Sequence, residues 1–330
     1  MSEPSRHIVI TDQEHQLPYS KGLMASSIMA TGLSPARAFH VAERIEERLH
    51  SRLVSSITRA ELLDVARTVL REEVGERYAQ SFYKWQLVNQ IDRALVILIG
   101  GATGVGKSTI ATQLAARLGI TRIIPTDAIR EVMRSMFSEQ LMPTLHTSSF
   151  DTERLVRQPL RRSADPVIVG FREQAAAVAV GVNALISRAV VEGTDLVLEG
   201  AHIVPGFVNP ASFEEAVVVP LIVTVDDEEL HRSHFFSRSQ DSRGRPADRY
   251  LEFFPNIRKI HRYLRSLALE HGVPVVHSYD LDSTLSQVIE LVVRAAVQAV
   301  PPKERTPRSG APQPGSDPPA LTEAGVSPLP

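Results

Sequence analysis

The fold of this 330-residue chain is restricted most strongly by a glycine-rich octapeptide that follows a short, wholly apolar segment. Residues 94–99 read Ala-Leu-Val-Ile-Leu-Ile, the pattern of a buried strand, and residues 101–108 read Gly-Ala-Thr-Gly-Val-Gly-Lys-Ser. Ile110, Leu114 and Leu118 then recur at the spacing of an amphipathic helix. A glycine-rich turn between such a strand and such a helix is typical of a loop that binds phosphate groups.

The residue types in 101–108 suit the binding of a nucleoside triphosphate. The glycines let the backbone turn its N–H groups inward around a phosphate, next to the positive end of the following helix. We expect Lys107 to neutralise the β- and γ-phosphates and the Ser108 hydroxyl to coordinate magnesium, so ATP and Mg²⁺ are the predicted cofactors. The predicted nucleotide-binding residues are Gly101, Ala102, Thr103, Gly104, Val105, Gly106, Lys107, Ser108 and Thr109. The alternative is a plain strand-to-helix turn with a solvated lysine, and the order of strand, loop and helix argues against it.

From residue 94 onward, strand-like segments alternate with helix-like ones, which predicts an α/β fold with a parallel sheet flanked by helices, of the P-loop NTPase type. The expected strands are 94–99, 122–125, 195–199, 216–225 and 273–277. The expected helices begin at Lys107, near Asp127, at Gly170, near Asp227, at Asn256 and near Thr284.

The two ends of the chain differ from this alternating part. Everything N-terminal to residue 94 has helix-like patterns, with apolar residues spaced by three and four over 34–53 and 58–73. We therefore predict a small helical domain over 1–90 and the sheet domain over 91–300. Residues 301–330 contain nine prolines and almost no large apolar groups, so we expect a disordered tail.

Composition excludes several classes of partner. The net charge of −2 contains no block of like charge, which argues against a nucleic acid, and a small anionic metabolite is the expected partner. Because the chain has no cysteine, it has no disulfide, thiolate metal site or cysteine nucleophile, which favours a reducing, cytoplasmic location. The N-terminus lacks a signal-peptide pattern and no apolar run approaches the ~18 residues that span a bilayer, so we expect no membrane association. Assembly into a homo-oligomer is left open.

Two carboxylates follow strands of the predicted sheet. Asp127 comes after the strand 122–125, and Glu199 ends the strand 195–199. Both should lie at the carboxyl edge of the sheet, where ligands bind in open α/β folds. We assign Asp127 to the acceptor hydroxyl as a catalytic group and Glu199 to the metal or its water shell. The alternative for Asp127 is an N-cap of the helix that follows.

Arginines cluster between the fourth and fifth expected strands. A mobile segment there could close over the triphosphate, exclude water and stabilise charge on the transferring group. Arg238 and Arg243 are the preferred catalytic pair, while others are expected to be surface residues. The cluster consists of Arg232, Arg238, Arg243, Arg245 and Arg249.

The long connection between the second and third strands, residues 133–165, is placed to form an acceptor pocket. Arg130 and His146 are candidates to hold an anionic acceptor, with hydrogen bonds from Ser148 and Ser149. The alternative for His146 is a surface or packing role, which is commoner for a lone histidine.

Beyond these patterns, nearly all of residues 7–298 resemble the 2-phosphoglycerate kinase family. The resemblance is carried by Gly-Gly-Ala-Thr-Gly-Val-Gly-Lys-Ser-Thr at 100–109, Thr-Asp-Ala-Ile-Arg-Glu at 126–131, Leu-His-Thr-Ser-Ser-Phe at 145–150, Gly-Phe-Arg-Glu-Gln at 170–174 and Leu-Glu-Gly-Ala-His-Ile-Val-Pro-Gly at 198–206. It implies phosphorylation of 2-phosphoglycerate by ATP, giving 2,3-bisphosphoglycerate and ADP.

The N-terminal part resembles an ATP-cone domain through Leu-Pro-Tyr-Ser-Lys-Gly-Leu at 17–23 and Ala-Ser-Ser-Ile-Met at 25–29. This resemblance implies a regulatory nucleotide site in which a short basic hairpin and a lysine contact phosphates. Val-Ile-Thr-Asp at 9–12 lacks the basic residue expected beside the hairpin turn, which leaves Lys21 as the candidate contact. A purely structural docking domain is the alternative.

Three functional hypotheses follow. The first is transfer of the ATP γ-phosphate to 2-phosphoglycerate. The second keeps this machinery for another small hydroxy acid, a sugar acid or a nucleoside. The third is a nucleotide-gated regulatory ATPase without a small-molecule acceptor, against which Asp127, Glu199 and the arginine cluster all argue.

Overall fold

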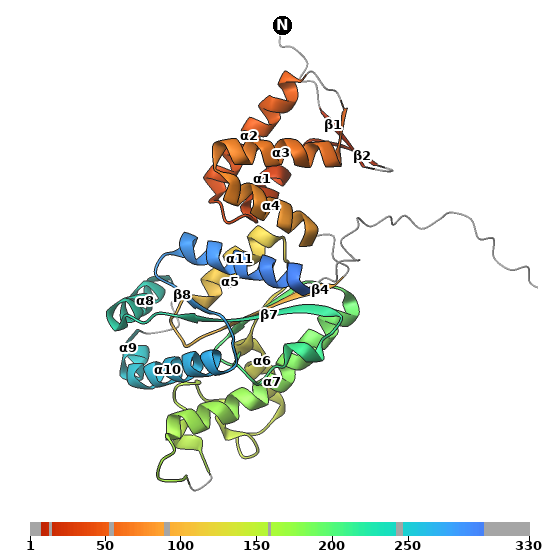
Figure 1. Ribbon diagram of the computed structural model, residues 1–330. Helices are drawn as coiled ribbons and strands as arrows, with labels where there is room; N and C mark the ends of the chain where they lie inside the picture. The colour runs from red at the N-terminus through yellow and green to blue at the C-terminus, as the bar shows by residue number, and fades with distance from the viewer. Residues whose placement is uncertain are drawn as a thin grey trace, which may run out of the picture.

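The protein is described by a computed structural model that covers residues 8–12, 15–52, 56–88, 93–157, 160–241 and 247–299. Figure 1 shows a helical part, which we call the N-terminal lobe (residues 8–88), beside a larger part that contains the main sheet, the sheet lobe (residues 93–299). The expected tail at 301–330 lies outside the described residues, and the predicted domain boundaries stay a prediction.

The N-terminal lobe consists of helices α1 (Lys21–Met29), α2 (Pro35–Ser51), α3 (Arg59–Glu73) and α4 (Glu76–Val88) and a small sheet. That sheet has the order β2-β1-β3 and contains β1 (Val9–Asp12), β2 (His15–Pro18) and β3 (Ser56–Thr58). The expectation that this whole part is helical is therefore wrong at three segments. Strands of three or four residues are too short to show a period, and β1 becomes a strand by pairing with β3 from more than forty residues away.

The start of α3 shows why the helices of this lobe were predictable. The Thr58 hydroxyl accepts a hydrogen bond from the Glu61 backbone N–H at 3.2 Å, and the Glu61 carboxylate accepts one from the Thr58 backbone N–H at 3.0 Å. This reciprocal capping box satisfies two backbone donors that the helix itself leaves unpaired. The apolar faces of the four helices meet in a core that includes Ile28, Ile45 and Leu70.

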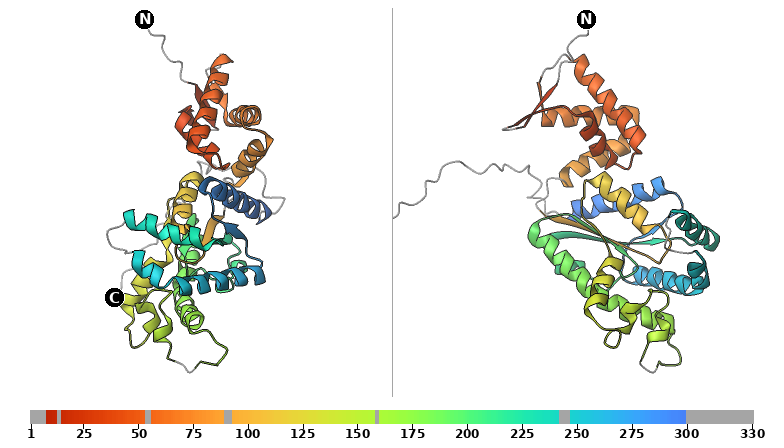
Figure 2. Two further views of the ribbon diagram at one scale, coloured as in Figure 1. Left: turned by 90° about the vertical axis from the view of Figure 1, so that its left-hand side faces the viewer. Right: turned by 180° about the vertical axis from the view of Figure 1, so that it is seen from behind.

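The sheet lobe is built on five parallel strands in the order β5-β6-β4-β7-β8. They are β4 (Ala94–Gly100), β5 (Ile123–Pro125), β6 (Leu196–Gly200), β7 (Ala216–Thr224) and β8 (Val275–His277). All seven residues of β4 are buried, because helices cover both faces of the sheet (Figure 2). The predicted α/β fold is confirmed.

Helices α5 (Lys107–Leu118) and α11 (Leu281–Ala299) cover one face of the sheet. The other face carries α6 (Thr126–Met136), α7 (Pro166–Glu192) and α10 (Phe254–Glu270) (Figure 1). The lobe is completed by α8 (Glu228–Asp241), α9 (Ala247–Glu252) and the 3₁₀ turns η1 (Pro143–His146), η2 (Glu153–Leu155) and η3 (Pro210–Ser212).

Helix α7 begins four residues before the predicted start at Gly170. The Asp165 carboxylate caps the Val167 N–H at 3.0 Å and Pro166 occupies the first turn, which together form an N-terminal signal that the apolar pattern alone does not reveal. By length and composition alone, this helix could cross a membrane, although charged residues interrupt its apolar sequence. Here Phe171, Val178 and Val182 are buried in the core of the lobe.

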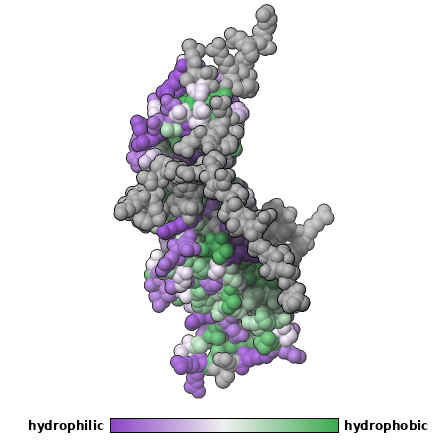
Figure 3. Space-filling view, turned by 90° about the vertical axis from the view of Figure 1, so that its right-hand side faces the viewer, coloured by the Kyte–Doolittle hydropathy of each residue, from purple (hydrophilic) through white to green (hydrophobic). Residues whose placement is uncertain are grey.

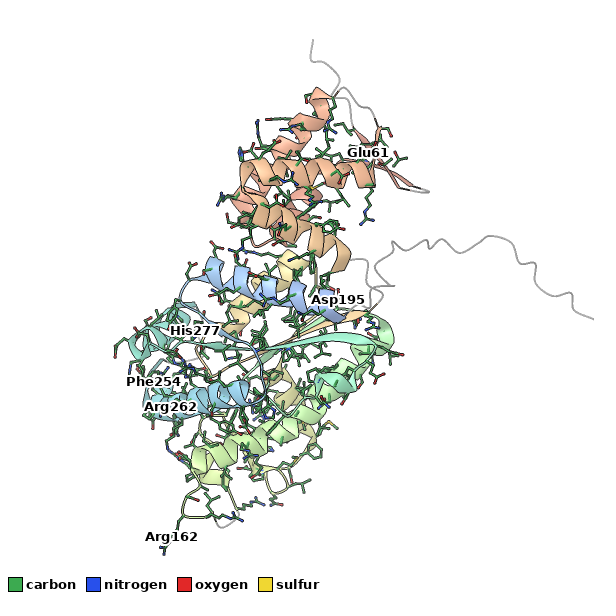
Figure 4. All side chains as sticks on the ribbon, viewed as in Figure 1. Glu61, Arg162, Asp195, Phe254, Arg262 and His277 are labelled. Carbon is green, nitrogen blue, oxygen red and sulfur yellow. The ribbon has the colours of Figure 1, made fainter. Side chains whose placement is uncertain are left out.

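The two lobes meet where α4 lies against α11. The Ser286 hydroxyl donates to the Gly32 carbonyl at 3.2 Å, and Arg77 pairs with Glu290 at 3.2 Å. On the face shown in Figure 3, hydrophilic side chains cover the N-terminal lobe and apolar ones gather over the sheet lobe. Figure 4 places Asp195 and His277 at opposite ends of the sheet, and His277, the last residue of β8, marks the carboxyl edge.

Candidate active site

The phosphate loop (residues 101–108) joins β4 to α5 at the carboxyl edge of the sheet. Gly104 and Gly106 have φ angles of 90° and 91°, a left-handed conformation that favours glycine. A Cβ atom on Gly104 would collide with the ring of Phe235, so glycine is also required by packing. The Lys107 side chain is buried, and its Nζ donates to the Ala102 carbonyl at 2.8 Å within the same loop.

Helix α8 holds the outer side of this loop through two histidines. His231 Nε2 lies 2.8 Å from the Thr103 carbonyl oxygen, and His234 Nδ1 lies 2.9 Å from the Gly104 carbonyl oxygen. Because carbonyls only accept, both histidines donate. A peptide whose C=O points toward α8 directs its N–H the opposite way, so these bonds set the direction of the N–H groups of Gly104 and Val105.

The protonation state of His231 is fixed by its surroundings. Arg258, which is buried, lies with Nη1 3.3 Å from His231 Nδ1 and donates to the Val225 carbonyl at 2.7 Å. An arginine can only donate, so His231 Nδ1 is the acceptor, and the single ring proton of His231 is on Nε2. Burial lowers the pKa of His231 to about 4, so that it is neutral at physiological pH. The sequence analysis missed both histidines; the only signal was their spacing of three on a helix.

Ser108 and Glu199, the two residues predicted to bind the metal, lie in contact with each other. The Ser108 hydroxyl donates to Glu199 Oε1 at 2.7 Å, and Glu199 is buried at the end of β6, next to β4. Hydroxyl and carboxylate oxygens are ligands that magnesium prefers. Within the described residues no group of three or more His, Asp or Glu is placed to hold a metal.

A cavity of about 700 Å³ opens beside these two residues. Its walls come from the phosphate loop, the β5–α6 junction, the connection after η1, the end of β6 and helix α9. The lining residues are Thr103, Lys107, Ser108, Pro125, Asp127, Ala128, Arg130, Glu131, Ser148, Ser149, Phe150, Glu199, Gly200, Ala201, Arg249 and Tyr250. The predicted phosphate and acceptor groups thus share one cavity.

Asp127 lies in the first turn of α6 with its side chain 69% exposed. The helix already begins at Thr126, and no side chain caps it, so the alternative role of Asp127 as an N-cap is not seen. Its carboxylate lies 3.8 Å from Arg130 Nε. Asp127 therefore presents a solvent-accessible carboxylate to the cavity that the buried Glu199 also lines.

The acceptor candidates divide into two groups. Arg130, Ser148 and Ser149 line the cavity, and Arg130 is anchored by a 2.7 Å hydrogen bond from Nη1 to the Leu145 carbonyl. His146 is not among the lining residues. Its Nε2 lies 2.9 Å from the Phe137 carbonyl oxygen, a packing contact between η1 and the end of α6.

The arginine cluster is described only in part. Arg243 lies outside the described residues, as does the side chain of Arg238 on α8. Arg249, which was named in the cluster but not preferred, lines the cavity together with Tyr250 and lies 3.7 Å from Asp151. Arg232 instead lies over the ring of Phe254, at 4.1 Å from its centre.

Lys21 lies in the N-terminal lobe, against carboxylates of α2. Its Nζ is 3.0 Å from Glu46 and 3.6 Å from Glu43, and it lies over the ring of Phe39. The hydrogen bond to Glu46 raises the pKa of Lys21. The positive charge is thus already balanced by two negative ones.

Three relatives of this chain among known proteins carry the same name, 2-phosphoglycerate kinase. The chain is 39% identical over 289 residues to the 2-phosphoglycerate kinase of Methanopyrus kandleri, covering 87% of each chain. It is 38% identical over 284 residues to that of Thermococcus kodakarensis, covering 86% of this chain and 96% of the relative. It is 37% identical over 296 residues to that of Pyrococcus furiosus, covering 90% and 96%. No protein-family model matches the chain.

The solved structures that match the chain are more distant. A gluconokinase from Sinorhizobium meliloti matches with a TM-score of 0.33 and 14% identity, covering 63% of this chain and 94% of its own. A shikimate kinase from Acinetobacter baumannii matches with a TM-score of 0.36 and 18% identity, covering 61% and 94%. The fold assignment rests on the strand order and phosphate loop described above.

Proposed function

Since the chain belongs to the 2-phosphoglycerate kinase family, we propose that it transfers the γ-phosphate of ATP to the free hydroxyl of 2-phosphoglycerate, giving ADP and 2,3-bisphosphoglycerate. The observation that carries the proposal is the shared cavity, which joins the phosphate loop to an exposed carboxylate and to two arginines. Phosphoryl transfer needs these groups within reach of one another, because it depends on positioning and charge stabilisation.

On the nucleotide side, the N–H groups of the phosphate loop would surround the β-phosphate and Lys107 would bind the β- and γ-phosphates. Ser108 and Glu199 would hold Mg²⁺ directly or through water, since their oxygens already face each other at 2.7 Å. The metal would neutralise charge between the β- and γ-phosphates when bound. We extend the proposal to Arg238 and Arg243 as residues that close over the triphosphate.

On the acceptor side, Asp127 would orient the hydroxyl and accept its proton as the new P–O bond forms and the bond to ADP breaks. 2-Phosphoglycerate carries a phosphate and a carboxylate, which require cations and hydrogen-bond donors. Arg130 and Arg249 would supply the cations, and the hydroxyls of Ser148 and Ser149 the neutral donors.

The proposal also covers location and regulation. Relatives of this kind act on small metabolites, and we place the chain in the cytoplasm on its lack of cysteine. Regulatory nucleotide binding at Lys21 stays a prediction. A phosphate would have to displace Glu43 and Glu46 from that lysine, which weakens the case for a sensor over a docking lobe.

The test is ADP release by the purified protein with Mg²⁺ and a panel of phosphoglycerates, sugar acids and nucleosides, followed by mass spectrometry of the product. We expect 2-phosphoglycerate to give the highest kcat/KM and a product heavier by one phosphoryl group. A different preferred acceptor would replace the substrate assignment, and ADP release that no acceptor stimulates would indicate a nucleotide-gated ATPase.

A further inference from the structure

Behind the acceptor side of the cavity lies a chain of buried hydrogen bonds that none of the roles above uses. Thr126, Gln174 and His202 are each at most 1% exposed. His202 Nδ1 lies 2.9 Å from the Thr126 hydroxyl, and His202 Nε2 lies 3.0 Å from Gln174 Oε1. The Gln174 amide nitrogen in turn donates to the Thr144 carbonyl and, at 3.0 Å, to the Thr147 carbonyl.

The direction of every bond in this chain is determined. A primary amide nitrogen has two hydrogens, and both are directed at backbone carbonyls, so the oxygen of Gln174 faces His202 and can only accept. His202 therefore carries its proton on Nε2, and its Nδ1 accepts from the Thr126 hydroxyl. Burial lowers the pKa of His202 to about 4, so this neutral tautomer persists at physiological pH.

Thr126 and His202 adjoin residues that line the cavity, and Gln174 of α7 reaches lining residues through Thr147. Thr126 precedes Asp127 at the start of α6. Thr147, which Gln174 of α7 holds, precedes the lining residues Ser148 and Ser149. His202 follows the segment 199–201, all of which lines the cavity.

The residues around this chain of hydrogen bonds are closely packed. Gly200, between Glu199 and His202, has a φ of 154°, and a Cβ atom there would collide with the Thr126 side chain. The end of β6 thus lies directly against the start of α6. Thr126, Gln174 and His202 also fall in separate motifs of the family resemblance, yet none of them touches the cavity.

We propose that Gln174 and His202 are positioning residues that fix the acceptor side of the cavity, holding Ser148 and Ser149 in register with Asp127. This inference rests on the proposed function. Removal of one member leaves buried polar groups of the others unpaired, and the connection after η1 shifts to satisfy them. A displacement near 1 Å at a reacting group is enough to impair transfer. The phosphate loop is held separately, by α8, so the nucleotide side should change little.

Two variants break the chain at chosen bonds. His202→Asn keeps an acceptor near the Nδ1 position for Thr126 but loses the donor to Gln174, and Gln174→Met keeps the length of the side chain but loses both donors. We expect the KM for 2-phosphoglycerate to rise about tenfold or more, with the KM for ATP changed less than about twofold. The ¹⁵N shifts of the wild-type imidazole should show the Nε2–H tautomer of His202.

The matched control is Val182→Ala, a buried cavity-forming change two turns further along α7. It should lower thermal stability without a selective rise in the KM for 2-phosphoglycerate relative to the KM for ATP. If His202→Asn or Gln174→Met fails to fold, Thr126→Val and Thr126→Ser decide. Thr126→Val should show the selective rise in the KM for 2-phosphoglycerate, and Thr126→Ser, which keeps the hydroxyl, should keep a KM close to that of the wild type.

The inference is overturned if the variants fold and keep the wild-type KM for 2-phosphoglycerate, or if both KM values rise together. Failure of the proposed function would look different, because the wild-type protein itself would then show no turnover of 2-phosphoglycerate. In that case the same comparison applies to whichever acceptor the panel identifies.

Discussion

The ammonium group of Lys107 lies within the phosphate loop it is expected to serve, 2.8 Å from a neutral carbonyl oxygen. A triphosphate attracts an ammonium group far more strongly than a carbonyl does, so bound phosphate would readily replace this hydrogen bond. Lys107 lines the cavity, whereas Lys21 lies in the N-terminal lobe beside two carboxylates that a phosphate would have to displace. The position of Lys107 in the loop therefore suits it to bind the phosphates of the nucleotide.

Lys107→Ala should lower kcat by about 10²–10³, because the lysine stabilises charge on the transferring group. The fold should survive, because the Lys107 ammonium group contacts the Ala102 carbonyl of its own loop and the side chain is not part of an apolar core. Steady-state kinetics with circular dichroism checks this, with Lys84→Ala, at an exposed position of α4, as the control. Wild-type turnover in the Lys107 variant would contradict the loop assignment.

Asp127→Asn should lower kcat by about 10²–10⁴, since asparagine cannot take the proton of the acceptor hydroxyl. ATP affinity, measured by calorimetry, should stay close to that of the wild type, because the Asp127 carboxylate is expected to contact the acceptor rather than the nucleotide. Asp282→Asn, an exposed carboxylate on α11, is the matched control. A selective loss of ATP binding would move Asp127 to the nucleotide side.

Motif and strand position predicted four residues that the structure brings to one cavity, because local sequence determines where they lie. Lys107 and Ser108 follow from the loop pattern, and Glu199 and Asp127 from the ends of strands that meet at one edge. His231 could not be found this way, and Arg249 was predicted only as a member of the arginine cluster that was not preferred. Both reach the site because α8 and α9 pack there, more than a hundred residues along the chain from the loop, and nothing local specifies that contact.

At the scale of elements, α8 is both the support of the phosphate loop and the start of the arginine-bearing segment. His231 and His234 tie its first half to the Thr103 and Gly104 carbonyls. Phe235 packs against Gly104 so closely that no side chain fits there. The first half of α8 would therefore stay attached to the phosphate loop during any movement of the later part of the helix.

This arrangement predicts that His231→Leu raises the KM for ATP about tenfold, because the peptide after Thr103 is no longer held with its N–H toward the phosphate. His231→Gln, whose amide N–H can reach the same carbonyl, should retain most of the wild-type value. The two variants are compared in steady-state kinetics with ATP varied. Equal KM values for leucine and glutamine would show that the hydrogen bond is irrelevant.

Element types in the sheet lobe were predictable, because long buried strands alternate with periodic helices in the sequence. The failures have two physical sources. β1 and β3 are strands only through their pairing, and the true start of α7 depends on a cap formed by Asp165 and Pro166 rather than on periodicity. Tertiary contacts and single capping groups are invisible to a hydrophobic pattern.

At the scale of the whole molecule, three buried histidines couple stability to pH. Burial lowers the pKa of His202, His231 and His261 to about 4, against 6.5 for an exposed histidine. Between these values the unfolded chain binds more protons than the folded one, so stability falls as pH falls through this window and is fully present above pH 6.5.

Each histidine should contribute a slope of about 1.4 kcal/mol per pH unit within that window. Urea unfolding at pH 7.5, 6 and 5 measures the free energy of unfolding directly. His202→Asn should reduce the slope of this free energy against pH by about the contribution of one histidine. The same free energy of unfolding at pH 7.5 and 5 would mean that these side chains are charged or solvated in the folded protein.

The central claim is that the phosphate loop and the acceptor groups around Asp127 act on one reaction in one cavity. Incubation with ATP labelled at the γ-phosphate, Mg²⁺ and 2-phosphoglycerate, followed by separation of the products, tests it most directly. The label should appear on the free hydroxyl position of the acceptor, in an amount equal to the ADP formed. Label recovered only as inorganic phosphate, at a rate indifferent to 2-phosphoglycerate, would contradict it.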